Sequence, residues 1–186
     1  MFRTDFSAQL YCTTEGYSGY VGVCDRGAAP WSTERDGWLV IRDRFKDNSK
    51  DARLLFLFEA DYGTRVYYRI RGADDGQGGD LAEGKLGYSL NGYVGFYGIS
   101  TANKILDHVS PLYAAFATQA TVKHWKLEAI TEWERYSRSL DGVQLHLRDD
   151  QGRRVAAYQD PLNGLEYLNV ESGKILTFEL HHIKIY

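Results

Sequence analysis

The sequence has little cysteine, proline or methionine, and no long hydrophobic run. Among 186 residues there are two cysteines, three prolines and one methionine. Two cysteines are too few for a disulfide scaffold. Cys12 and Cys24 are therefore predicted to be free, small apolar residues, with a single bridge between two neighbouring strands as the alternative. No apolar run approaches the roughly 18 residues of a membrane-spanning helix, so the sequence predicts no transmembrane segment.

An excess of charge of one sign is also missing. Lys and Arg number 22 against 25 Asp and Glu, which gives a formal net charge of −3. The basic residues are scattered, and those that flank Trp125 and Trp133 are interpreted as part of a solvated face. The sequence therefore predicts no nucleic-acid partner.

Signals for export, catalysis and metal binding are absent from the sequence. Its first six residues lack the basic and then apolar layout of a secretory signal, so a protein that is cytoplasmic, or exported without a cleaved signal peptide, is expected. GxSxG, HExxH, GxGxxG and GxxxxGK[ST] do not occur. Adjacent residues of a regular strand point to opposite faces, so His181 and His182 are not expected to chelate together. We therefore expect no catalytic residues, no metal and no cofactor. A hydrolase whose carboxylates meet only in the fold is an alternative.

Aromatic residues and glycine, in contrast, are abundant. The chain has 14 Tyr, 8 Phe, 4 Trp and 19 Gly, a composition typical of short strands joined by tight turns. Its length and its 44% hydrophobic content fit one domain over residues 1–186. The expected fold class is all-β.

A weak threefold repeat runs through the sequence. The segments 53–60, 123–130 and 176–183 share an aromatic-x-apolar pattern that places each pair on one face of a strand. This similarity divides the chain into pseudo-repeats at about 1–61, 62–130 and 131–186. Segment 18–23 also echoes segment 91–96, and the third unit keeps only residues 163–165 of that motif.

The pattern of the middle unit predicts the number of strands in each repeat. Asn91-Gly92 between apolar segments is a strong hairpin signal, because both residues tolerate positive φ. Strands are therefore predicted at 66–71, 85–90, 93–97 and 122–130. Four strands in each of three units give about twelve short strands, which suits a closed barrel capped by hairpins.

The segment 84–96, GKLGYSLNGYVGF, resembles the repeats of fascin-like proteins and trefoil lectins, and residues 10–17 resemble them faintly. The resemblance covers nearly the whole chain and implies a β-trefoil. The Gln-x-Trp motif of ricin-type lectins is missing, which places ricin-like sugar pockets in doubt. A β-sandwich is the alternative fold.

Two insertions interrupt the middle unit. Residues 72–84 lack apolar periodicity and are predicted to be a surface loop. The insertion at 98–121 is predicted to contain a capped short helix at 110–116, and residues 131–140 fit a second helix or an extended segment equally well.

The surplus of aromatic side chains suggests a binding surface. Tyr and Trp offer a flat apolar face and one hydrogen-bonding group, which suits the C–H face and hydroxyls of a sugar. The candidates lie where turns meet strands, together with three aspartates whose Gly-rich segment reads as a solvated acidic loop and not as a Ca²⁺ site. The predicted ligand-binding residues are Trp31, Trp38, Asp74, Asp75, Asp80, Tyr88, Asn91, Tyr97 and Trp133. For Trp38, a place in the core is the alternative.

The expected function is that of a non-enzymatic binding domain whose partner is a carbohydrate or a glycoprotein surface. The ligand class follows from the fold resemblance. The alternative is a protein-interaction module, such as a fascin-like bundler, an inhibitor or the receptor-binding domain of a toxin, with residues 98–121 as its contact loop. The sequence leaves the oligomeric state open.

Overall fold

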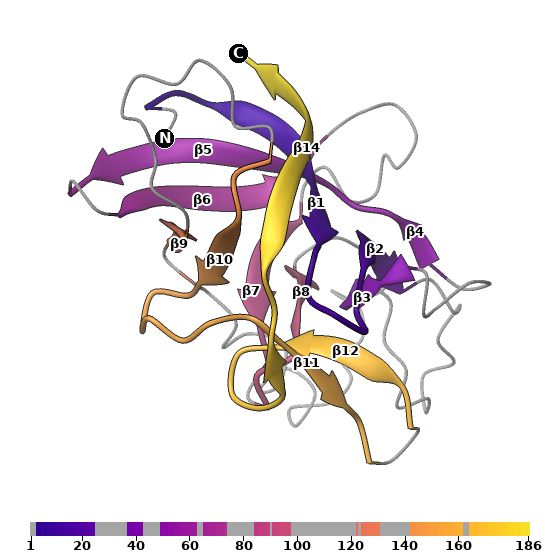
Figure 1. The fold of residues 1–186 in the computed structure, drawn as a ribbon. Coiled ribbons are helices and arrows are strands. Elements are labelled where there is room, and N and C mark those ends of the chain that lie inside the picture. The colour runs from indigo at the N-terminus through magenta and orange to yellow at the C-terminus, as the bar shows by residue number, and fades with distance from the viewer. Residues whose placement is uncertain are drawn as a thin grey trace, which may run out of the picture.

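The fold is all-β in the computed structural model (Figure 1). The structure describes residues 3–24, 37–42, 49–62, 65–73, 84–89, 91–97, 122, 124–130, 142–161 and 164–186. The helices predicted at 110–116 and 131–140 lie outside the described residues, as do most of the 72–84 loop and all of the 98–121 insertion.

The described strands are short, as the turn-rich composition predicts. In chain order they are β1 (Phe6–Cys12), β2 (Gly19–Cys24), β3 (Leu39–Ile41), β4 (Ser49–Asp51), β5 (Arg53–Asp61), β6 (Val66–Gly72), β7 (Lys85–Tyr88), β8 (Val94–Tyr97), β9 (Trp125–Ala129), β10 (Leu145–Arg148), β11 (Ala156–Gln159), β12 (Glu166–Asn169), β13 (Lys174–Ile175) and β14 (Phe178–Ile185).

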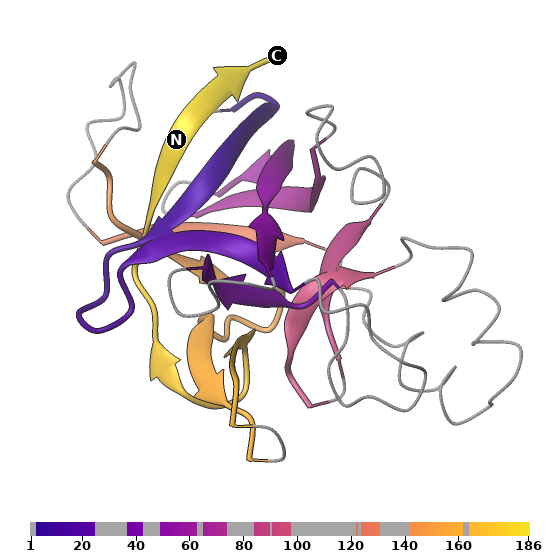
Figure 2. The ribbon, with the colours of Figure 1, turned by 90° about the vertical axis from the view of Figure 1, so that its right-hand side faces the viewer.

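Six of these strands form a closed antiparallel barrel. β1 pairs with β5, β5 with β6, β6 with β9, β9 with β10, β10 with β14, and β14 returns to β1. In Figures 1 and 2 the yellow β14 runs beside the indigo β1, which joins the two ends of the ring. Closure removes the unpaired edges that an open sheet would expose. It differs from the β-sandwich alternative, in which two stacked sheets do not share a ring of pairs.

Three hairpins lie between successive barrel strands. They are β2–β3, β7–β8 and β11–β12, and β4 and β13 extend the first and the third. Figure 1 shows the second and third hairpins below β5 and β6. The second strands of the three hairpins meet, because a bridge joins Trp38 to Gly95 and another joins Tyr93 to Asn169. We call this group of three hairpins the hairpin cap.

The aromatic-x-apolar pattern lies in the last strand of each of the three pseudo-repeats. Phe56, Trp125 and Phe178 are buried in β5, β9 and β14, on the barrel interior. The echo between segments 18–23 and 91–96, however, does not relate equivalent strands, because the first segment enters β2 and the second enters β8. The equivalent positions are Gly37, Gly92 and Gly164, which have positive φ and precede β3, β8 and β12.

Stacked rings fill the barrel and connect it to the cap. Phe6 stacks on Phe56 with ring centroids 4.6 Å apart, and Tyr68 meets both rings edge-on. Trp125 is buried, and its indole N–H donates to the carbonyl of Leu86 in β7 at 3.0 Å. A buried Trp of this kind removes about 150–250 Å² from water. This single side chain therefore stabilises both the barrel and the middle hairpin.

The contact between β3 and β8 leaves no space for a side chain at Gly95. An added Cβ there would lie 2.6 Å from the carbonyl oxygen of Gly37 and 3.0 Å from the Cα of Trp38. Because backbone atoms would have to move, we expect Gly95→Ala to lower the free energy of unfolding by about 2–3 kcal/mol. Urea unfolding followed by circular dichroism measures this change.

Gly16→Ala is the matched control. Gly16 has φ +81°, and its added Cβ would meet no atom within 4 Å. Only the left-handed backbone opposes this substitution, at a cost of about 1 kcal/mol. Equal losses for the two variants would contradict the proposed close contact between the hairpins.

Candidate functional site

Four of the nine predicted ligand-binding residues are described, and all four belong to the hairpin cap. Trp38 precedes β3, Tyr88 ends β7, Asn91 lies in the turn that follows, and Tyr97 ends β8. The other five predicted residues lie outside the described part of the chain: Trp31, Asp74, Asp75, Asp80 and Trp133.

Trp38 belongs to an aromatic group at the centre of the cap. Its ring stacks on Tyr93 with centroids 4.4 Å apart and an interplanar angle of 6°. Tyr167 meets both rings edge-on, so each hairpin contributes one ring. Trp38 is only 8% exposed. The structure thus places Trp38 in the core, which was the alternative for this residue.

Tyr97 and Tyr93 use their hydroxyls inside the cap. The Tyr97 hydroxyl donates to the carbonyl of Tyr93 at 2.8 Å. The Tyr93 hydroxyl donates to Oδ2 of Asp160 at 2.8 Å, and both side chains are buried. Burial is the main cause that raises the pKa of Tyr93 far above its usual range, and the hydrogen bond to Asp160 is the second cause. The Tyr93 hydroxyl therefore joins the second hairpin to the third, whereas the Tyr97 hydroxyl makes its bond within the second hairpin.

Tyr88 lies in a mixed aromatic and polar cluster on the surface. Its ring is half-buried, and the guanidinium carbon of Arg153 lies 4.6 Å from the ring centroid. The Gln151 side chain donates from Nε2 to the Tyr88 hydroxyl at 3.2 Å. Glu171 accepts from Nη1 of Arg153 at 3.1 Å. We call Tyr88, Gln151, Arg153 and Glu171 the Tyr88 cluster.

A buried carboxylate holds Arg153 of this cluster in place. Asp149 is fully buried; its Oδ2 accepts from Nε of Arg153 and its Oδ1 from the Arg153 backbone N–H, both at 2.7 Å. Gly152, at φ +87°, closes the turn between the two residues. Partial burial works to lower the pKa of Arg153, but the hydrogen bond and the charge of Asp149 outweigh it and raise that pKa. The guanidinium is therefore a fixed, permanent charge beside Tyr88.

Asn169 connects the Asn91 turn to Glu171. Its side-chain N–H donates to the carbonyl of Asn91 at 2.8 Å, and its Oδ1 accepts from the backbone N–H groups of Glu171 and Ser172. Asn169 is buried, whereas the Asn91 side chain is exposed. The predicted residues Tyr88 and Asn91 therefore lie at the edge of one hydrogen-bonded surface.

The half of this surface that comes from the third unit was not predicted from the sequence. Asp149, Gln151 and Arg153 come from the turn between β10 and β11, and Glu171 follows β12. The sequence Asp-Asp-Gln-Gly over 149–152 is typical of a turn and offered a local signal. The contact between this turn and Tyr88 joins residues that are far apart in the sequence. It forms only when the three hairpins assemble, so no local pattern predicts it.

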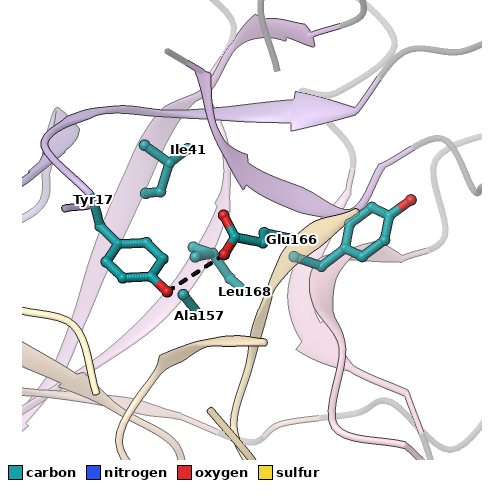
Figure 3. A pocket seen from close by; sticks show the side chains of 6 residues that line it. Tyr17, Ile41, Ala157, Glu166 and Leu168 are labelled. Atoms are coloured by element: carbon teal, nitrogen blue, oxygen red, sulfur yellow. Dashed lines mark hydrogen bonds between the residues drawn. The ribbon is translucent and has the colours of Figure 1, made fainter. Parts of the chain in front are cut away.

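A shallow depression lies between residues of the first and third hairpins (Figure 3). Its walls carry the Tyr17 hydroxyl, which donates to Oε1 of Glu166 at 3.4 Å. The residues that line it are Tyr17, Ile41, Ala157, Glu166, Tyr167 and Leu168. The space between them does not admit a water-sized molecule. This depression therefore offers a surface contact and not an enclosed pocket.

Within the described ranges, no group of three or more His, Cys, Asp or Glu side chains is arranged to hold a metal ion. In the same part of the chain, no helix is long and apolar enough to cross a membrane. Cys12 and Cys24 are buried and are not joined by a disulfide, as the sequence favoured. Burial raises the pKa of the Cys12 thiol.

Comparison of the chain with models of protein families, with curated proteins and with solved structures gives no match. The geometry of the cap is therefore the basis for a functional interpretation.

Asp149 and Glu171 contact the same guanidinium but differ in burial, and this difference predicts their contributions to stability. Asp149→Ala leaves Arg153 without its buried partner, so we expect a loss of about 2–3 kcal/mol in the free energy of unfolding. Glu171, with a side chain 43% exposed, is the matched control. Its Ala variant should change stability by about 0.5 kcal/mol or less, because solvent screens exposed ion pairs. Urea unfolding separates the two cases, and similar losses would show that Asp149 is not the anchor.

Proposed function

We propose that the chain is a β-trefoil. Support comes from the closed ring of six strands and from the three hairpins, which lie between β1 and β5, between β6 and β9, and between β10 and β14. Each hairpin contributes one aromatic ring to the centre of the cap, which is consistent with a threefold arrangement. The three rings are those of Trp38, Tyr93 and Tyr167. The repeat pattern of the sequence points in the same direction.

We propose further that the protein is a non-enzymatic domain that binds carbohydrate on the Tyr88 cluster. The observation that carries this proposal is the half-buried Tyr88 ring, surrounded by an amide, a guanidinium and a carboxylate. An apolar ring beside planar donors and acceptors suits both the C–H face and the hydroxyls of a sugar. The buried ion pair with Asp149 pre-organises this surface, which lowers the entropic cost of binding.

Three carboxylates of the described chain are held in ion pairs, which favours binding over hydrolysis at their positions. Asp149 and Glu171 both pair with Arg153, and Glu128 pairs with Arg148 and Arg154. A carboxylate that is held in an ion pair is poorly suited to give or take a proton during catalysis. These three carboxylates are therefore poor candidates for the acid or base of a hydrolase.

A glycan array with labelled protein tests this proposal. We expect binding to a related family of glycans, with competition by the free sugar at millimolar concentration. Tyr88→Ala should weaken that binding by about tenfold or more, which corresponds to ~1.4 kcal/mol or more. Gln151→Ala, at an exposed position, should weaken it less.

Tyr62→Ala is the control for the loss of an aromatic side chain. Tyr62 is 74% exposed and packs against Tyr67 of the barrel, not against the Tyr88 cluster. Its removal should leave glycan binding unchanged. A blank array from folded protein would refute the carbohydrate proposal and favour the protein-interaction module, to be tested by a pull-down with residues 98–121 intact and deleted.

A further inference from the structure

Two neighbouring imidazoles of the barrel strand β14 and a phenol of β2 converge where the first hairpin leaves the barrel. Nδ1 of His181 lies 3.1 Å from the Tyr20 hydroxyl, and Nε2 of His182 lies 3.4 Å from the same oxygen. His181 and Tyr20 are half-buried, and His182 is exposed. The three side chains belong to β14 and β2, so this group is separate from the Tyr88 cluster and does not depend on the proposed function.

A β-bulge in β14 explains why both imidazoles reach one hydroxyl. Ser7 pairs with Lys184 and Gln9 pairs with His181, so two residues of β14 stand opposite Ala8 alone. His182 occupies the bulge with φ 52°, the left-handed conformation that glycine usually provides there. The expectation that His181 and His182 point apart holds for a regular strand. It is wrong here because the bulge interrupts the alternation.

The bulge is strained, and a specific contact supports it. A left-handed conformation costs a residue with a side chain about 1–2 kcal/mol. Nη2 of Arg53 donates to the carbonyl of His182 at 2.6 Å, and its Nε donates to the buried Ser7 hydroxyl. Glycine would fit this bulge without strain, so packing alone does not account for an imidazole at this position. Strained residues of this kind concentrate at functional sites.

The surroundings of His181 direct one of its nitrogens toward Tyr20. Nε2 of His181 lies 3.3 Å from Oε2 of Glu179, and the Tyr11 ring stacks on the imidazole with centroids 5.0 Å apart. When Nε2 carries the proton and donates to the carboxylate, Nδ1 presents its lone pair toward Tyr20. Histidines that bind metals are typically oriented by a carboxylate in this way.

We propose that Nδ1 of His181, Nε2 of His182 and the hydroxyl oxygen of Tyr20 bind a divalent transition-metal ion such as Zn²⁺ or Cu²⁺. Imidazole nitrogens are preferred ligands of these ions. Ligand atoms at bond lengths of about 2.0–2.1 Å around a tetrahedral ion lie about 3.3 Å apart, close to the two distances observed here. Tyr20 binds as phenolate and releases its proton to solvent, and water completes the coordination.

Calorimetric titration of the full chain with Zn²⁺, after removal of any affinity tag, tests the site. We expect one ion per chain with a micromolar dissociation constant. His181→Ala and Tyr20→Phe should each weaken binding at least tenfold, and Glu179→Gln should weaken it about tenfold through the orientation of His181. His124→Ala is the control, because that imidazole packs against Tyr67 and not against Tyr20.

Loading with Cu²⁺ tests the phenolate directly. A phenolate ligand gives a visible charge-transfer band, which we expect in the wild-type protein and not in Tyr20→Phe. A titration without heat or saturation, or equal affinity in the His181 and His124 variants, would overturn the site. A copper complex without the band would overturn the ligand set.

His182→Gly separates metal binding from folding. Glycine relieves the left-handed backbone and removes a ligand, so the metal-free variant should unfold at the same urea concentration as the wild type or at a higher one. The same variant should lose Zn²⁺ binding at least tenfold and should show no rise in unfolding temperature with Zn²⁺. A stable His182→Gly variant that binds Zn²⁺ as the wild type does would contradict the proposal.

Discussion

The pairing of β1 with both β14 and β5 closes the sheet, and the rest of the structure depends on this closure. It brings the first and last described strands together and encloses Phe6, Phe56 and Tyr68 in one core. The ring also fixes where the three hairpins leave the barrel, so that Trp38, Tyr93 and Tyr167 meet at the centre of the cap. Pairings between distant segments are slow to form, because loop-closure entropy must be overcome before they stabilise the fold.

Local signals in the sequence predicted several of the strands. The aromatic-x-apolar pattern predicted strands around Phe56, Trp125 and Phe178, all of which are buried, and Asn91-Gly92 predicted the middle hairpin turn. Which strands of the three hairpins correspond to one another was not predictable in the same way. Segments 18–23 and 91–96 resemble each other, but the first enters β2, the first strand of its hairpin, and the second enters β8, the second strand of its hairpin. Glycines at corresponding turns are poor markers of register, because only their φ angles distinguish them from the many other glycines of the chain.

The candidate surfaces show the same division between local and distant information. Tyr88 and Asn91 were predicted because they flank a recognisable turn. Arg153 and Glu171, which complete the Tyr88 cluster, come from the third unit and are brought there by the cap. The group around His182 escaped prediction because a bulge changes the direction of side chains without a mark in the residue pattern. In both cases the chemistry arises where the regular pattern of the strands ends.

We propose that a sugar binds on the hairpin cap, at the Tyr88 cluster, and not beside Tyr62 and Tyr67 on the barrel. Chemical shifts in ¹H–¹⁵N NMR spectra, recorded during addition of free monosaccharides to millimolar concentration, test it most directly. We expect shifts that are concentrated at residues 88, 91, 151 and 171, including the side-chain amide of Gln151. Shifts centred on Tyr62 and Tyr67, or no shifts with any sugar, would contradict it.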